Sequence, residues 1–179
     1  MKIILCGLNG AGKSTVGKAL AQRLGFPFRD IEDYYFPDGS GDYKYRSSRT
    51  REEVSALLLR DLRELEHVVL ASVKGDYGGE VEEQFTHAVY LEVPRETRLA
   101  RVRARAYGQF GVRIDPGGDL YDREERFFRM VRDRTDAHVT DWLDRLSIPV
   151  VIVDGTQSAE TVVEKILEAL KDTVQRTGG

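Results

Sequence analysis

A glycine-rich stretch near the start of the chain could bind phosphate. Residues 7–15 read GLNGAGKST, with the spacing Gly7-x4-Gly12-Lys13-Ser14. Glycines allow close approach of the backbone, so that successive N–H groups can point at phosphate oxygens. A turn without a ligand could share this composition. However, the stretch lies between an expected strand and an expected helix, which is the context in which the pattern binds nucleotides. We therefore predict a nucleoside triphosphate site here.

The lysine and the hydroxyl of this stretch have separate expected tasks. Lys13 can bridge the β- and γ-phosphates of ATP, and Ser14 can ligate Mg²⁺. The helix that follows directs its positive end at the same place. The expected nucleotide contacts are Asn9, Gly10, Ala11, Gly12, Lys13, Ser14 and Thr15. Replacement of Lys13 by alanine is expected to abolish Mg–nucleotide binding in calorimetry.

Acidic side chains follow the second expected strand, in the stretch RDIEDYYF. Asp30, Glu32 and Asp33 then lie at the carboxyl end of a parallel strand, where open α/β sheets bind ligands. A carboxylate there can hold Mg²⁺ or accept the proton of an attacking hydroxyl. A solvated turn is the alternative interpretation. We expect Asp30 to act as the metal-side acid or as the base, and Glu32 or Asp33 to face the acceptor.

With these two features together, the sequence resembles the P-loop small-molecule kinases, such as shikimate kinase, gluconate kinase and adenylate kinase. In shikimate-kinase-like members, a D-x-D pattern supplies one metal-side and one substrate-side carboxylate. The corresponding residues here read Asp30-x-Glu32, so the second carboxylate is a glutamate or is replaced by Asp33. The resemblance implies ATP and Mg²⁺ as cofactors and a small molecule as the phosphate acceptor.

Arginines are concentrated in one part of the chain. Ten of them lie within residues 98–134, and on an ideal helix Arg98, Arg101 and Arg105 fall on one face. A solvated face with ion pairs would explain this pattern. The order of a helix, a glycine-rich stretch with Arg113 and a second helix also resembles the lid of adenylate- and shikimate-kinase-type enzymes. The resemblance implies a lid over residues 98–123, in which Arg101, Arg105 and Arg113 stabilise the transferred phosphoryl group and Arg105 contacts the nucleotide.

The last third of the sequence resembles the end of adenylate kinases. An arginine-bearing helix and a last strand precede the turn DGTQS at residues 154–158. By that resemblance, Gly155 and Thr156 lie beside the adenine, although a turn with a helix-capping serine explains the same residues. The resemblance also places one of Arg129 and Arg132 in the site.

The resemblance places the phosphate acceptor against residues 34–51. This segment is rich in aromatic and basic side chains, namely Tyr34, Tyr35, Tyr43, Tyr45, Arg46, Arg49 and Arg51. Such side chains can bind a ring or an anion, although tyrosines are also often half-buried packing residues. Lys74 and Asp76, after the third expected strand, could face the same pocket. The expected substrate contacts are Glu32, Asp33, Arg49, Lys74, Arg129 and Arg132.

Apolar runs and helical spacing predict the elements that position these residues. Strands are expected at residues 2–6, 26–29, 67–73, 87–93 and 148–153, and helices at 13–24, 50–66, 95–106, 122–146 (in one or two pieces) and 158–174. Thr50 and Glu53 fit a capping box at the start of the second helix. Strands that alternate with helices favour a parallel sheet covered on both faces. We expect a single α/β domain over residues 1–179, a three-layer α/β/α fold with a five-stranded parallel sheet and a short helical lid.

Composition narrows the class of protein. The net charge of −3 disfavours a nucleic-acid or membrane partner, and the single cysteine, Cys6, excludes an internal disulfide. We expect a cytoplasmic enzyme, monomeric or homodimeric, that transfers the γ-phosphoryl group of ATP to a hydroxyl or phosphate of a small metabolite. Two alternatives stay open. One is a regulatory nucleotide-binding ATPase without an acceptor, because the third expected strand does not end in an acid. The other is a nucleic-acid end kinase, which the arginine-rich segment would suit.

Overall fold

Five parallel strands form the sheet that positions the phosphate loop. The computed structural model describes residues 1–37 and 48–177. The strands are β1 (Lys2–Cys6), β2 (Phe28–Asp30), β3 (Val68–Ala71), β4 (His87–Glu92) and β5 (Val150–Asp154). Their order across the sheet is β2-β3-β1-β4-β5, and each neighbouring pair is parallel. The predicted five-stranded parallel sheet is confirmed, and the carboxyl ends of all five strands lie at one edge.

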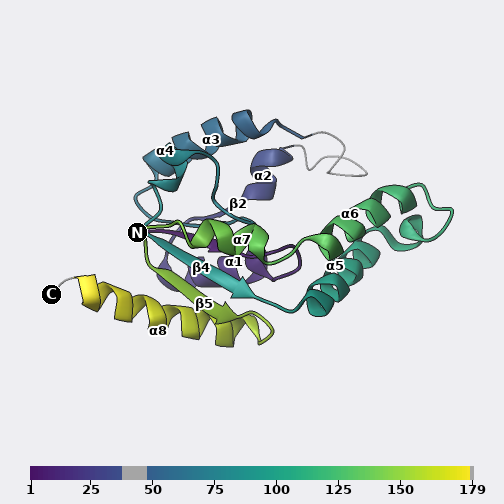
Figure 1. Cartoon of the computed structure of the whole chain (residues 1–179). Coiled ribbons are helices and arrows are strands. Elements are labelled where there is room, and N and C mark those ends of the chain that lie inside the picture. Colours follow the sequence, from purple (N-terminus) through teal and green to yellow (C-terminus); the bar gives the residue numbers. More distant parts are fainter. Residues whose placement is uncertain (38–47, 178–179) are drawn as a thin grey trace.

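Helices cover both faces of the sheet, and Figure 1 shows them in chain order. They are α1 (Lys13–Leu24), α2 (Ile31–Tyr35), α3 (Arg51–Glu64), α4 (Gly79–Glu82), α5 (Arg95–Phe110), α6 (Tyr121–Asp133), α7 (Ala137–Leu143) and α8 (Ala159–Thr177), with a 3₁₀ helix, η1 (Gly111–Ile114). The expected helix over 122–146 is two helices, α6 and α7. Both halves of the capping box at Thr50 and Glu53 are present. The short helices α2 and α4 were not expected.

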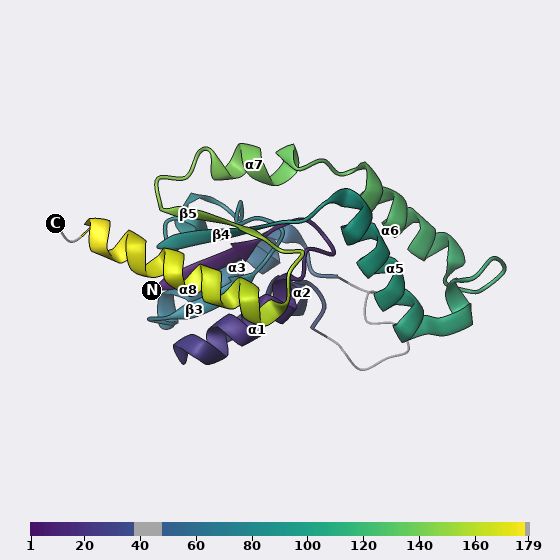
Figure 2. The ribbon, with the colours of Figure 1, turned by 90° about the horizontal axis from the view of Figure 1, so that it is seen from below.

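One face of the sheet packs against α1 and α8, which lie together below the strands in Figure 2. Alternate residues of β1, Ile3 and Leu5, point to this face and are fully buried. Val16 and Leu20 of α1 meet them there, together with Ile166 of α8. The apolar helical spacing of both helices therefore serves the core and not the site.

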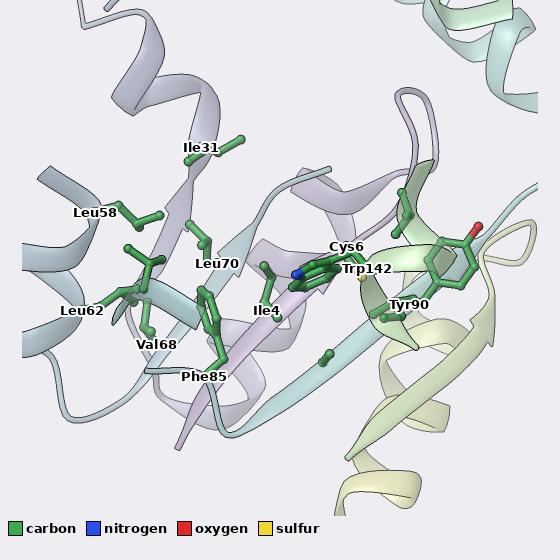
Figure 3. Packing of buried hydrophobic residues seen from close by; sticks show 14 of the residues in the cluster. Ile4, Cys6, Ile31, Leu58, Leu62, Val68, Leu70, Phe85, Tyr90 and Trp142 are labelled. Carbon is green, nitrogen blue, oxygen red and sulfur yellow. The ribbon is translucent and has the colours of Figure 1, made fainter. Parts of the chain in front are cut away.

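The opposite face carries the larger core, which contains Ile4 and Cys6 of β1 (Figure 3). Helices α3, α4 and α7 cover it, and α7 contributes Trp142, which is almost fully buried. The indole Nε1 of Trp142 donates a hydrogen bond of 3.2 Å to Glu82 Oε2, so its polar atom has a partner at the end of α4. Burial raises the pKa of the Cys6 thiol to about 12, which leaves a neutral core side chain.

Helices α5 and α6, with η1 between them, extend beyond the carboxyl ends of the strands (Figures 1 and 2). We call residues 95–133 the α5–α6 arm. The arm has an apolar cluster of its own, in which Val102, Phe128 and Val131 are buried. The expected lid, residues 98–123, lies within it. Among the described helices, none combines the length and the apolar character that a membrane crossing requires.

Candidate active site

The phosphate loop follows β1 and ends at the first turn of α1. Gly7, Gly10 and Gly12 have φ angles of 148°, 85° and 96°, a region that side-chain-bearing residues rarely adopt. Gly10 also cannot carry a side chain, because a Cβ there would lie 2.4 Å from the carbonyl oxygen of Arg98. The glycine spacing is therefore required by this backbone shape, which turns the loop around the amino end of α1.

Lys13 is half-buried at the start of α1, and its Nζ donates to the carbonyl oxygen of Leu8 at 3.2 Å. Burial lowers the pKa of Lys13 from 10.5 to about 8. The nearby carboxylates of Asp30 and Glu32 offset part of this effect, because they favour the charged ammonium. An anionic ligand in the loop would favour the ammonium further, so the electrostatics suit a bound phosphate.

Ser14 and Asp30, the two residues expected to face Mg²⁺, are in contact. Ser14 Oγ donates to Asp30 Oδ2 at 2.5 Å, and Asp30 Oδ1 accepts from the backbone N–H of Glu32 at 3.0 Å. Asp30 therefore links the start of α1 to the start of α2, which it caps. A hydroxyl and a carboxylate side by side form a donor set that suits Mg²⁺ beside a triphosphate.

One cavity of about 690 Å³ joins three parts of the molecule. The phosphate loop and the first turn of α1 form its floor, with Lys13 and Ser14 among the lining residues. One wall comes from the end of β2 and α2 and includes Asp30 and Glu32. The α5–α6 arm supplies the other wall, which carries three arginines, Arg101, Arg105 and Arg123. Carboxylates and guanidinium groups thus face a common space that includes the phosphate loop.

Arg101 connects the arm to the expected adenine side of the site. Its Nη1 donates to the carbonyl oxygen of Gly155 at 3.0 Å and lies 3.5 Å from that of Ala11. Its Nη2 reaches the carbonyl oxygen of Thr156 at 3.5 Å. The turn after β5 and the phosphate loop are therefore side by side. Contact of Gly155 and Thr156 with the adenine stays a prediction.

The other predicted arginines of the arm have different surroundings. Arg113 pairs with Asp119 through two hydrogen bonds of 3.0 and 2.6 Å, outside the cavity. Arg129 is exposed, and Arg132 pairs with Asp133 at 2.8 Å. Neither lines the cavity. Their roles with a bound ligand stay predictions.

Arg134 is a residue that the sequence reasoning missed. Its Nη1 donates to Asn9 Oδ1 of the phosphate loop at 3.2 Å, and burial lowers its pKa. Helix α6 ends at Asp133, so Arg134 leaves the helix and turns back to the loop. Helical periodicity alone could not reveal this contact, because the periodicity no longer applies at that position.

The expected acceptor residues divide between the cavity and its surroundings. Glu32 lines the cavity, whereas Asp33 on the same short helix is exposed and lies outside it. Arg49 Nη1 donates to the carbonyl oxygen of Tyr34 at 2.9 Å, away from the lining. Lys74 also lies outside the lining and pairs with Asp76 at 2.8 Å. The expected contacts at residues 43, 45 and 46 lie outside the described residues.

Aromatic lining residues are a second group that was missed in part. Tyr35 was considered as a ring or anion contact, and it lines the cavity. Phe36 and Tyr77 stand on the same side, and Phe110 and Phe127 line the cavity from the arm. Tyr77 follows β3, in a stretch where only Lys74 and Asp76 were predicted to face the pocket. Local sequence patterns could not show that this stretch packs beside the end of α2.

Comparisons with known proteins agree with this geometry. Residues 3–125 match the model of a family described as "AAA domain". The chain is 30% identical over 155 residues to a shikimate kinase of Neisseria gonorrhoeae. The aligned region covers 75% of this chain and 85% of that protein. The chain belongs to the P-loop small-molecule kinases.

This P-loop kinase has further relatives over nearly its full length. It is 28% identical over 176 residues to the uncharacterised protein YqaC of Bacillus subtilis, across 94% of this chain and 96% of that one. A gluconokinase of Sinorhizobium meliloti has the same fold, with a TM-score of 0.62, 21% identity and coverage of 98% and 94% of the two chains. Membership of this family implies the use of ATP, commonly with Mg²⁺. The cluster of Lys13, Ser14 and Asp30 fits both groups.

Proposed function

We propose that this P-loop kinase is an ATP-dependent phosphotransferase that moves the γ-phosphoryl group to a hydroxyl or phosphate of a small metabolite. The observation that supports this most is the shared cavity. It places the phosphate loop between a wall with two carboxylates and a wall with arginines. A donor and a small acceptor could therefore meet there.

Each lining group has a role in this proposal. Lys13, Arg101 and Arg105 stabilise the charge that develops on the transferred phosphoryl group. Mg²⁺, when bound beside Ser14 and Asp30, neutralises charge on the nucleotide phosphates. Glu32 lines the acceptor side of the cavity and accepts the proton of the attacking hydroxyl. The acceptor oxygen forms a bond to the γ-phosphorus while the bond from that phosphorus to the bridging oxygen breaks, and ADP leaves.

The test is ADP release with a panel of small acceptors, measured for the wild type and for Asp30→Asn. We expect acceptor-dependent ADP release that falls at least roughly a hundredfold in the variant, since charge stabilisation of this kind contributes on the order of 10²–10³. Asp144→Asn is the matched control, because Asp144 is an exposed acid outside the cavity. It should keep the wild-type rate.

An acceptor-independent ATPase rate that is unchanged in Asp30→Asn would refute the proposal. That result would favour a regulatory nucleotide-binding ATPase instead. One observation keeps this second candidate in view. The residue after β3 is the buried Ser72, whose Oγ donates to the carbonyl oxygen of Lys74 at 2.8 Å, so no acid ends this strand.

A further inference from the structure

The acceptor side of the cavity has an aromatic wall. Tyr35 and Phe36 at the end of α2 have ring centroids 6.1 Å apart, and Tyr35 lies 6.4 Å from the ring of Tyr77. All three line the cavity. Tyr77 comes from the segment between β3 and α4, so two separate parts of the chain build this wall. Rings at these distances and tilts form a surface on which another flat ring can pack.

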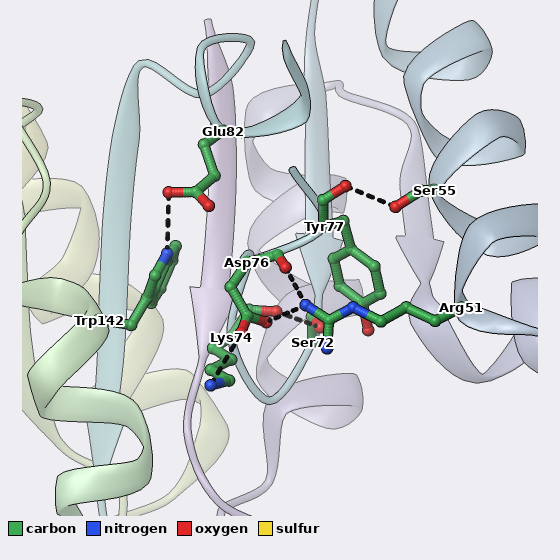
Figure 4. Close-up of polar contacts among 8 residues, drawn as sticks. All are labelled: Arg51, Ser55, Ser72, Lys74, Asp76, Tyr77, Glu82 and Trp142. Carbon is green, nitrogen blue, oxygen red and sulfur yellow. Dashed lines mark hydrogen bonds and ion pairs between the residues drawn. The ribbon is translucent and has the colours of Figure 1, made fainter. Parts of the chain in front are cut away.

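Tyr77 presents a neutral ring to the cavity. Burial raises the pKa of the Tyr77 phenol well above its usual range, and Ser72 and Tyr35 are its hydrogen-bonding neighbours. The guanidinium of Arg51 lies over the Tyr77 ring, with its carbon 5.4 Å from the centroid, and holds it from outside the cavity (Figure 4). The backbone oxygen of Tyr77 also accepts from Ser55 Oγ at 2.5 Å. The ring is therefore fixed in place before a ligand binds.

The cations near this wall are committed to other partners. Arg51 and Lys74 both pair with Asp76, at 3.3 and 2.8 Å, and Figure 4 shows the three side chains together. Arg51 also donates to the backbone oxygen of Asp76. Neither cation lines the cavity, and Arg49 is bonded to a backbone carbonyl. Among the described residues, the charged groups on the acceptor wall are thus the carboxylates of Asp30 and Glu32.

A hydroxy acid would fit this wall poorly. Its carboxylate would lie near that of Glu32, with no described cation on that wall to balance the two charges, and like charges in a confined site are unfavourable. The cations that line the cavity are Lys13 of the phosphate loop and Arg101, Arg105 and Arg123 of the α5–α6 arm, all away from this wall, where the phosphates of ATP would engage them. A flat uncharged ring, in contrast, could stack on the tyrosines while its hydroxyl group approaches Glu32.

We propose that the acceptor is an uncharged hydroxyl compound that carries a planar ring, as a nucleoside does, and that it is not a hydroxy acid. This rests on the phosphotransferase function proposed above. The ring packs on Tyr35 and Tyr77, and the hydroxyl faces the phosphate loop. Its oxygen bonds to the γ-phosphorus of ATP, its proton passes to Glu32, and the products are ADP and a phosphate monoester.

The test compares two acceptor classes at equal concentration with Mg-ATP, and follows both ADP and the mass of the product. The first class is the common ribo- and deoxyribonucleosides, and the second is shikimate and gluconate. We expect a phosphate monoester from at least one nucleoside and none from the hydroxy acids. Phosphorylation of shikimate or gluconate would overturn the proposed acceptor class, and so would a failure to phosphorylate any nucleoside. In either case, ADP release with other small acceptors still tests the phosphotransferase function. If no acceptor of any class releases ADP, the proposed function fails as well.

Variants of the wall give a second readout. Tyr35→Leu should raise the KM of the ring acceptor roughly tenfold, since stacking of a base on an aromatic ring contributes on the order of 1–3 kcal/mol. The KM of ATP should not change. Tyr35→Phe keeps the ring and should keep the wild-type KM, and Tyr107→Leu is a control on an exposed tyrosine outside the cavity. An acceptor KM in Tyr35→Leu equal to that of Tyr107→Leu would overturn stacking on this wall.

Discussion

Nucleotide affinity should depend on pH through Lys13. The pKa of this side chain in the ligand-free protein is about 8, because burial penalises the ammonium more than the nearby carboxylates favour it. A bound triphosphate adds several negative charges and raises that pKa, so binding takes up a proton when the solution pH lies above 8. Affinity is therefore fully present well below pH 8 and decreases as the pH rises through that value.

The size of the effect follows from the protonated fraction. With a ligand-free pKa of about 8, the ammonium fraction falls from roughly three quarters at pH 7.5 to about one tenth at pH 9. The dissociation constant of Mg-ATP should then increase roughly eightfold, which is about 1 kcal/mol. A lysine with an ordinary pKa of 10.5 would change the affinity by only a few per cent over this range.

Titration calorimetry at pH 7.5 and 9, in buffers of different ionisation enthalpy, measures both the affinity and the proton uptake. The matched variant is Lys13→Arg, since a guanidinium stays charged across this range. Its weaker binding should be independent of pH. A wild-type affinity that is equal at both pH values, with no proton uptake at pH 9, would refute the electrostatic role assigned to Lys13.

Three further substitutions test the structure around the site by chemical denaturation. Gly10→Ala should lower the free energy of unfolding by about 2 kcal/mol or more and abolish ATP binding, because it adds a backbone clash to a positive φ. Its control is Gly25→Ala, at a positive φ in open space, which should lower the free energy of unfolding by about 1 kcal/mol. Thr50→Ala removes one half of the capping box of α3 and should cost about 1 kcal/mol. Arg98→Met should cost only about 1 kcal/mol, although Arg98 is only 3% exposed. The variant loses the Nε hydrogen bond to the Val93 carbonyl oxygen, but Nη1 has no partner among the described residues and the paired aspartate, Asp136, is exposed. A loss of 3 kcal/mol there would contradict this reasoning.

The features that sequence patterns predicted are local ones. The phosphate loop needs its glycines for positive φ angles at fixed positions, so residues 7–15 carry the signal within themselves. The five strands were likewise recognisable, since both faces of a parallel sheet are buried and its strands read as apolar runs. Asp30 was placed correctly at the end of β2, because the carboxyl ends of parallel strands meet at one edge.

The features that were missed depend on contacts between distant residues. Arg134 reaches Asn9 across 125 positions, after a helix whose end could not be located to one residue. The aromatic wall combines the end of α2 with Tyr77, and the spacing of these residues in sequence has no period that would relate them. Likewise, the pairing of Lys74 and Arg51 with one aspartate could not be read from composition, because charge runs do not specify partners.

The most direct test of the account is the fate of the γ-phosphoryl group. ATP labelled at the γ-phosphate would be incubated with the protein, Mg²⁺ and the acceptor panel, and the label would be followed by chromatography and mass spectrometry. The account predicts label on an organic acceptor, dependent on the presence of that acceptor and lost in Lys13→Ala. Label that appears only as inorganic phosphate, at the same rate with and without every acceptor, would contradict it.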